Sequence, residues 1–70
     1  MTNEKREKFS RLQDRLKELS SLNDKIGRLA FYINNEKENG NSIDELMAIQ
    51  LMYMMSYRAA LEQRIDRGVY

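Results

Sequence analysis

The chain has 70 residues, of which 41% are hydrophobic and 33% are charged. Its 12 Lys and Arg against 11 Asp and Glu leave a net charge of +1, less basic than a general nucleic-acid coat protein usually is. Cys and His are both absent, which excludes disulfides, thiolate or imidazole metal sites, and Cys-His or Ser-His catalytic dyads. A lone core of this size rarely supplies more than about 3–5 kcal/mol, so we expect one small domain, residues 1–70, stabilised by association with other chains.

The first residues and the apolar segments indicate where in the cell to expect the protein. The first residues, Met1 to Lys5, contain no apolar segment of the kind that a secretory signal peptide carries. The longest apolar run is shorter than the roughly 18–20 residues that span a bilayer. We therefore expect a cytoplasmic protein without a membrane partner.

The first half of the chain has the apolar period of a helix. Pro is absent, and the apolar residues recur at alternating spacings of three and four with longer steps of seven, as a heptad stripe of about three and a half repeats. This stripe comprises Phe9, Leu12, Leu16, Leu19, Ile26 and Ile33, with Leu22 and Leu29 immediately beside it.

The segment Ser20 to Asp24 leaves two alternatives open. Ser and Asn compete for backbone hydrogen bonds, and Ser21 with Asp24 imitates a helix-capping box. The chain therefore forms either one straight helix or a helix at about 3–19 that hinges at 20–23 into a second helix at about 22–36. In either case Gly27 lies inside a helix, where Gly more often permits close backbone packing than ligand approach.

Charges cluster near the start, where residues 4–17 hold six basic and three acidic side chains. The simpler interpretation is a solvated helix face with pairs one turn apart, such as Glu4 with Lys8. The alternative is a rim that collects phosphate groups.

A polar connection and a last helix follow. Asn39-Gly40 is a turn signal. Ser42 and Glu45 have the spacing of an N-cap and its N3 partner, so we predict a helix at about 43–67 that ends at Gly68.

This last helix is apolar on nearly every side between Leu46 and Tyr57. A single antiparallel partner covers one face, and an isolated hairpin would leave an apolar patch of the kind that marks a protein interface. The sequence therefore predicts an all-α fold: a helical hairpin with an N-terminal helical arm that assembles into an oligomeric bundle, a dimer at least.

Few residues of the sequence suggest a catalytic or ligand-binding site. Asp44 and Glu45 are explained by the helix start, and the three Gly residues form no phosphate loop, so we expect no enzyme and no cofactor. Lys25 and Arg28 flank Gly27 and can receive a phosphate, although a solvated surface pair is the simpler interpretation. Tyr53 and Tyr57, one turn apart, either stack a base or point their rings into a core.

The chain resembles a family of small phage-encoded helical proteins that includes the anti-CBASS sponges, which sequester the cyclic oligonucleotide signals of bacterial antiviral defence. The resemblance covers roughly residues 20–66 and rests on the following residues on either side of the polar turn: Leu22, Lys25, Leu29, Phe31, Ile33, Leu46, Gln50, Met54, Tyr57, Leu61, Arg64 and Ile65.

The resemblance implies a hexamer of interlocked dimers with ligand pockets between protomers, acting in the cytoplasm of an infected bacterium. It implies that an aromatic ring on the N-terminal helix and a following lysine hold base and phosphate, for which Phe9 and Lys25 are the candidates. An arginine near the end of the last helix, here Arg64, would serve a separate pocket for cyclic trinucleotides. Phe9 departs from the family pattern because it lacks a hydroxyl group and also fits the core stripe.

Three hypotheses remain from the sequence. The leading one is a non-catalytic sponge for cyclic di- or trinucleotides, with Phe9, Lys25, Arg28 and Arg64 as ligand-binding residues and no duplex nucleic acid as partner. The main alternative is a small helical dimer that binds a host or phage protein through its Met-rich face. A chorismate-mutase-like dimer is the third, since Leu12 to Lys25 resembles the start of such chains, but those sites need several cations converging across a larger bundle.

Overall fold

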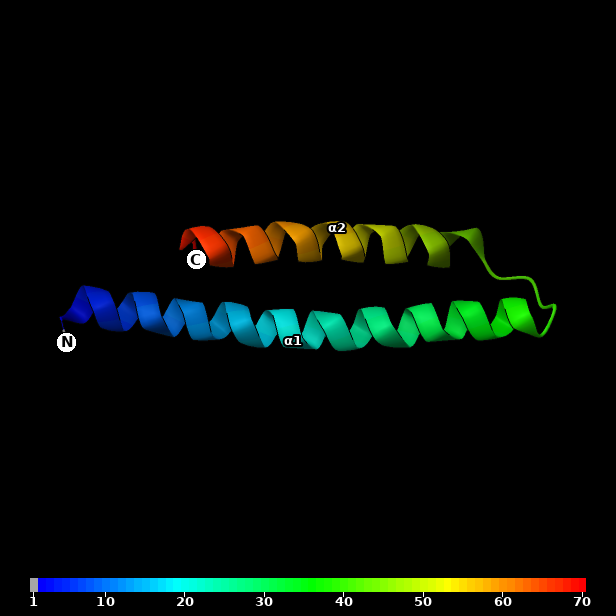
Figure 1. The fold of residues 1–70 in the computed structure, drawn as a ribbon, viewed down its shortest axis with the longest axis horizontal. Coiled ribbons are helices and arrows are strands. Elements are labelled where there is room, and N and C mark those ends of the chain that lie inside the picture. Colours follow the sequence, from blue (N-terminus) through cyan, green and yellow to red (C-terminus); the bar gives the residue numbers. More distant parts are fainter. Residues whose placement is uncertain (1) are drawn as a thin grey trace.

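The computed structural model describes residues 2–70, and within them the chain forms two α-helices and no strand. Helix α1 comprises Asn3–Glu38 and helix α2 comprises Glu45–Arg67. The helices lie antiparallel and side by side in a rod of 57 × 15 × 15 Å (Figure 1). The predicted all-α hairpin is therefore confirmed. The N-terminal end of α1 extends beyond α2, and residues 2–11 are exposed (Figure 1).

Helix α1 is continuous through Ser20 to Asp24, so of the two alternatives the structure contains the straight helix. Leu19, Leu22 and Ile26 on this stretch pack against α2. This packing outweighs the local preference of Ser and Asn for non-helical backbone. Gly27, inside the helix, has no atom within 4 Å of the position that a Cβ would take, so its predicted role in close packing is not seen within one protomer.

The start of α2 differs from the prediction. Asp44, not Ser42, is the N-cap, and its Oδ1 accepts a hydrogen bond from the Leu46 backbone N–H at 2.9 Å. The helix begins at Glu45, two residues after the predicted start. The predicted end is confirmed, because Gly68 takes the left-handed conformation with φ of 71° and donates its N–H to the last carbonyl groups.

The core lies where the two helices face one another. Leu22 and Ile26 of α1 and Leu61 of α2 are buried, and partly buried neighbours surround them: Leu19, Leu51, Met54 and Ile65. Ile33 is also buried. Of the predicted stripe, however, Leu16 and Phe9 are 41% and 55% exposed. At about 100° per residue they lie roughly 80° and 100° around α1 from Ile26, which turns them away from α2.

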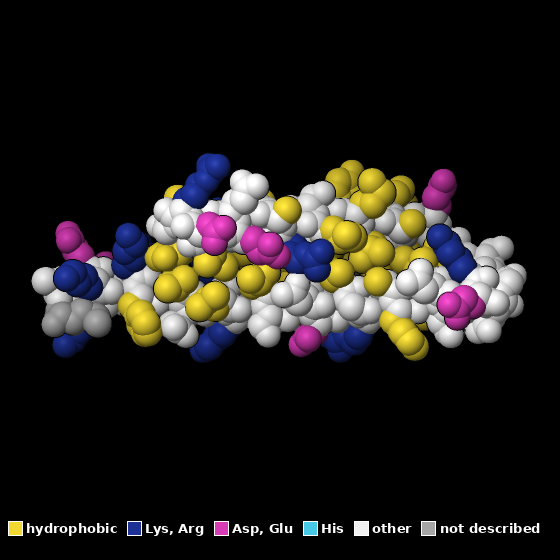
Figure 2. Space-filling model, viewed as in Figure 1, with side chains coloured by type: hydrophobic (Ala, Val, Ile, Leu, Met, Phe, Trp, Pro, Cys, Tyr) yellow, Lys and Arg dark blue, Asp and Glu magenta, His cyan; other side chains and the backbone are white. Residues whose placement is uncertain are grey.

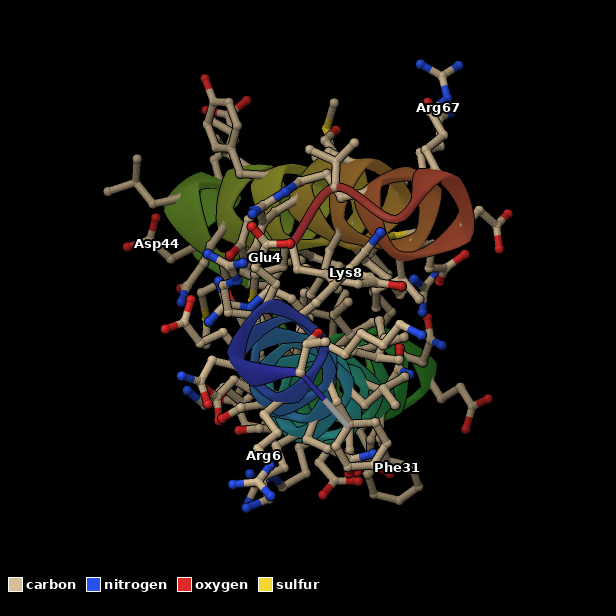
Figure 3. The ribbon with its side chains drawn as sticks, turned by 90° about the vertical axis from the view of Figure 1, so that its left-hand side faces the viewer. Glu4, Arg6, Lys8, Phe31, Asp44 and Arg67 are labelled. Atoms are coloured by element: carbon tan, nitrogen blue, oxygen red, sulfur yellow. The ribbon has the colours of Figure 1, made fainter. Side chains whose placement is uncertain are left out.

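Helix α2 buries one of its apolar faces and leaves the others in solvent, as expected for a single antiparallel partner. Figure 2 shows hydrophobic side chains along the seam between the helices and a second group over the first half of α2. The large apolar side chains of α2 that remain exposed are Leu46, Ile49, Met52, Tyr53, Met55 and Tyr57. Phe31 of α1 is 73% exposed and points away from α2 (Figure 3).

Candidate functional site

The first candidate site is a groove of about 390 Å³ between the helices, here called the basic groove. Helix α1 contributes Lys25, Arg28, Leu29 and Tyr32 to it, and helix α2 contributes Met47, Gln50 and Met54. The α1 residues are spaced by three, one and three, so they form a single side of that helix. One groove therefore combines two cations, a phenol ring and an amide with an apolar floor.

A second groove of about 400 Å³, here called the aromatic groove, adjoins the first. It is lined by Leu22, Leu46, Ile49, Gln50, Tyr53, Met54 and Tyr57. Gln50 and Met54 line both grooves, which places the two side by side on the hairpin. The aromatic groove contains no cation among its lining residues, so the two grooves differ in chemistry.

The two cations of the basic groove form no ion pair with a carboxylate of residues 2–70 in the same protomer. Within residues 2–70, the ion pairs join Arg15 to Glu18 and Arg58 to Glu62. Lys25 and Arg28 are both exposed. Their charges are therefore directed at solvent, where an anion can approach them.

Tyr57, in the wall of the aromatic groove, is tied to α1. Its hydroxyl group donates a hydrogen bond to Oε1 of Glu18, and the Arg15 Nε atom lies 3.0 Å from the other oxygen of that carboxylate. The Arg15 N–H is not aligned for a hydrogen bond, so this contact is an ion pair. The hydrogen bond to Glu18 raises the pKa of Tyr57 above its ordinary value. The ring is thus held in place by the neighbouring helix.

Arg64 holds the end of the chain. Its Nε donates to the Val69 carbonyl oxygen at 3.2 Å, and a terminal guanidinium nitrogen donates to the Tyr70 main-chain oxygen at 2.9 Å. The Lys8 ammonium lies 6.0 Å from the centre of the Tyr70 ring, and Lys8 lies between the helices in Figure 3. Arg64 is ten residues beyond Met54, which lines the basic groove with Lys25, and therefore lies about 15 Å from that groove along α2.

The structure thus brings together two of the four predicted ligand-binding residues. Lys25 and Arg28 share the basic groove, whereas Arg64 and Phe9 line neither groove. Phe9 is 16 residues from Lys25 on a continuous helix, about 24 Å along its axis. Within one protomer, Phe9 and Lys25 cannot contact the same small ligand.

Two groove residues were missed in the sequence. Tyr32 follows Lys25 by seven residues, two helical turns, and this spacing alone predicts that both side chains share one side of a helix. Gln50 is the other, and it interrupts the apolar run of the last helix. Its place depends on how α2 is rotated relative to α1, which the sequence pattern left open.

Residues 2–70 contain no cluster of three or more Asp or Glu side chains that could hold a metal ion. Neither of their helices is long and apolar enough to cross a membrane.

A protein-family model described as Sequestin matches residues 9–67, which include most of α1, the whole of α2 and both grooves. No curated protein and no solved structure matches the chain.

Proposed function

The chain belongs to the Sequestin family, and from this premise we propose that it sequesters cyclic di- or trinucleotides between protomers without converting them. The family name suggests a sequestering role, which requires a binding site and no reaction. The specific ligand comes from the resemblance to anti-CBASS sponges, in which such binding protects a phage against bacterial defence.

The observation that carries the proposal is the composition of the basic groove. Lys25 and Arg28 supply two positive charges for the two phosphates of a cyclic dinucleotide, and charge-assisted hydrogen bonds are the stronger ones. Tyr32 supplies a ring for a flat base, and Met47 and Met54 supply apolar contacts. The groove therefore matches an anionic ligand with planar parts.

An open groove on one hairpin covers only one side of such a ligand, whereas small-molecule sites usually bury about 70–90% of the ligand surface. A second protomer can provide the missing wall. Met52 and Met55, which are exposed on α2 and line neither groove, give the chain a reason to associate, and we propose a dimer at least and up to a hexamer. In such an assembly Phe9 reaches the ligand of a neighbouring protomer, and Arg64 contributes to a separate site for trinucleotides.

Isothermal titration calorimetry with a panel of cyclic di- and trinucleotides tests the proposal. Wild type binds at least one of them, and the double variant Lys25→Met/Arg28→Met weakens that binding by at least about 100-fold, because hydrogen bonds to charged groups contribute about 1.5–3 kcal/mol each.

The matched control is Lys17→Met/Arg67→Met, which removes the same charge from exposed positions that line neither groove. This control keeps the wild-type affinity to within a few-fold. Equal loss in both double variants would attribute binding to net charge, and no binding by wild type would end the proposal.

A second candidate function has its own observation. Met52 and Met55 are 67% and 44% exposed on α2, and such side chains suit an adaptable protein-binding surface. In this alternative the chain is a small helical dimer that binds a host or phage protein. Light scattering separates the two: a dimer that binds no cyclic nucleotide favours the protein partner, and a larger assembly that binds one favours the sponge.

A further inference from the structure

Gln50 occupies an unusual place in the hairpin. Three neighbouring side chains of α2 that line the basic groove or pack against the core are apolar and half-buried: Met47, Leu51 and Met54. Gln50 is on the same side of α2 as Met47 and Met54, at spacings of three and four, yet it is exposed. The amide therefore lies at the junction of the basic and aromatic grooves, both of which it lines.

The aromatic groove offers two rings beside this amide. Tyr57 is held by its hydrogen bond to Glu18, so its ring is positioned before any ligand arrives. Tyr53, one turn earlier, is 73% exposed. Leu46 and Ile49 complete an apolar wall. These surfaces suit the flat face of a heterocycle, and aromatic rings stack on any base because every base has a π-face.

We propose that the aromatic groove binds a nucleobase and that Gln50 is the residue that reads its edge. The inference rests on the proposed function, since the phosphates of the same ligand occupy the adjoining basic groove. A primary amide presents one acceptor oxygen and an NH₂ donor, so it pairs with a base edge that offers a donor next to an acceptor. Adenine has such an edge, and paired Gln–adenine hydrogen bonds are a standard mode of base recognition.

This division assigns a different role to each group. Lys25 and Arg28 supply affinity for phosphate, whichever base is present. Tyr53 and Tyr57 supply stacking, which tolerates any base. Gln50 alone supplies discrimination. The chemical class of the ligand is therefore an anionic nucleotide with a base that carries an exocyclic amino group beside a ring nitrogen.

A double-mutant cycle between protein and ligand tests the proposal. The two ligands are cyclic di-adenylate and its analogue with unsubstituted purine in place of adenine, which lacks only the exocyclic amino groups. Calorimetry compares wild type with Gln50→Leu, a variant of similar size without hydrogen-bonding groups. Wild type favours the adenine ligand by about fivefold, the usual net value of one hydrogen bond, and the variant binds both ligands equally.

The outcomes separate this inference from the function on which it rests. One outcome is that Lys25→Met/Arg28→Met weakens the binding of both ligands while Gln50→Leu keeps the wild-type preference for adenine. That result would support the basic groove as the phosphate site and overturn the reading of the base by Gln50. If wild type binds neither ligand, both proposals are overturned. A wild type without preference between the two ligands also overturns the role of Gln50.

A further variant tests whether a second copy of the chain fills the aromatic groove instead. Tyr53→Ala lowers the affinity for both ligands about tenfold, because stacking on the ring is lost. It leaves the mass of the assembly, measured by light scattering, unchanged. A changed mass with unchanged affinity would assign the groove to contacts between protomers and overturn its role as a base site.

Discussion

Tyr57 shows how one side chain connects the two helices and a candidate site. Its hydroxyl group donates to Glu18 on α1 while its ring lines the aromatic groove on α2. The hydrogen bond to a carboxylate favours the protonated phenol, and the nearby negative charge disfavours the phenolate, so both raise the pKa of Tyr57.

This raised pKa predicts a stability difference that depends on pH. The folded protein keeps the phenol protonated to higher pH than the unfolded chain does, so the contribution is complete below the ordinary pKa of 10.0. It is lost as the pH rises through the folded-state pKa. Urea unfolding of wild type and Tyr57→Phe from neutral to alkaline pH checks this: wild type is more stable at neutral pH, and its advantage shrinks above pH 10.

Tyr53→Phe is the control for that series, because the Tyr53 ring is 73% exposed on the same helix. Its stability relative to wild type is the same across the series to within experimental error. A constant difference between wild type and Tyr57→Phe at all pH values would contradict a hydrogen bond that requires the protonated phenol.

At the scale of the residue, the sequence predicted part of the site. Lys25 and Arg28 were identified because they flank Gly27, a pattern that lies within one helix. Phe9 was expected either in the core or at the ligand, and it is neither in the hairpin core nor in a groove. Gln50 could not be placed, because its position depends on which face of α2 meets α1.

The sequence predicted the end of α2 correctly but placed its start two residues too early. Gly68 was identified as the end of α2 because a left-handed residue at this position strongly favours Gly, and the structure confirms it. The start was misplaced, since Ser42 and Asp44 are both good N-caps and only the geometry shows that Asp44 accepts the Leu46 N–H. The hinge at 20–23 was left open for a related reason: local signals favoured a break, while the packing of Leu22 and Ile26 keeps α1 straight.

The N-cap assignment predicts a clear contrast between two substitutions. Asp44→Ala removes the side-chain acceptor of the first helical turn and lowers the free energy of unfolding by about 1 kcal/mol. Ser42→Ala, two residues earlier, changes it by less than about 0.5 kcal/mol because Ser42 caps no helix. Urea unfolding followed by circular dichroism measures both. A larger loss in Ser42→Ala than in Asp44→Ala would restore the earlier helix start.

At the scale of the whole molecule, one hairpin exposes more large apolar side chains than it buries. Within residues 2–70, the buried apolar side chains are Leu22, Ile26, Ile33 and Leu61, while a longer set of large apolar side chains is exposed. The sequence predicted this imbalance because the last helix is apolar on more faces than one partner covers. It could not predict how further copies are arranged, since that depends on shapes that arise only when the hairpin has formed.

The separation of two candidate residues along α1 means that the proposed site needs more than one protomer. Phe9 and Lys25 are about 24 Å apart on one rigid helix, so they can act on one ligand only if they come from different protomers. The basic groove is open to solvent and needs a second wall. Under the proposed function, the ligand is therefore held only by an assembly of hairpins.

Native mass spectrometry of the purified protein with a cyclic dinucleotide tests whether the ligand needs an assembly, because it reports the number of chains and of ligands in the same species. We expect assemblies of two or more chains to retain the ligand and any monomer in the same spectrum to lack it. A monomer that retains the ligand, or assemblies that retain none, would contradict it.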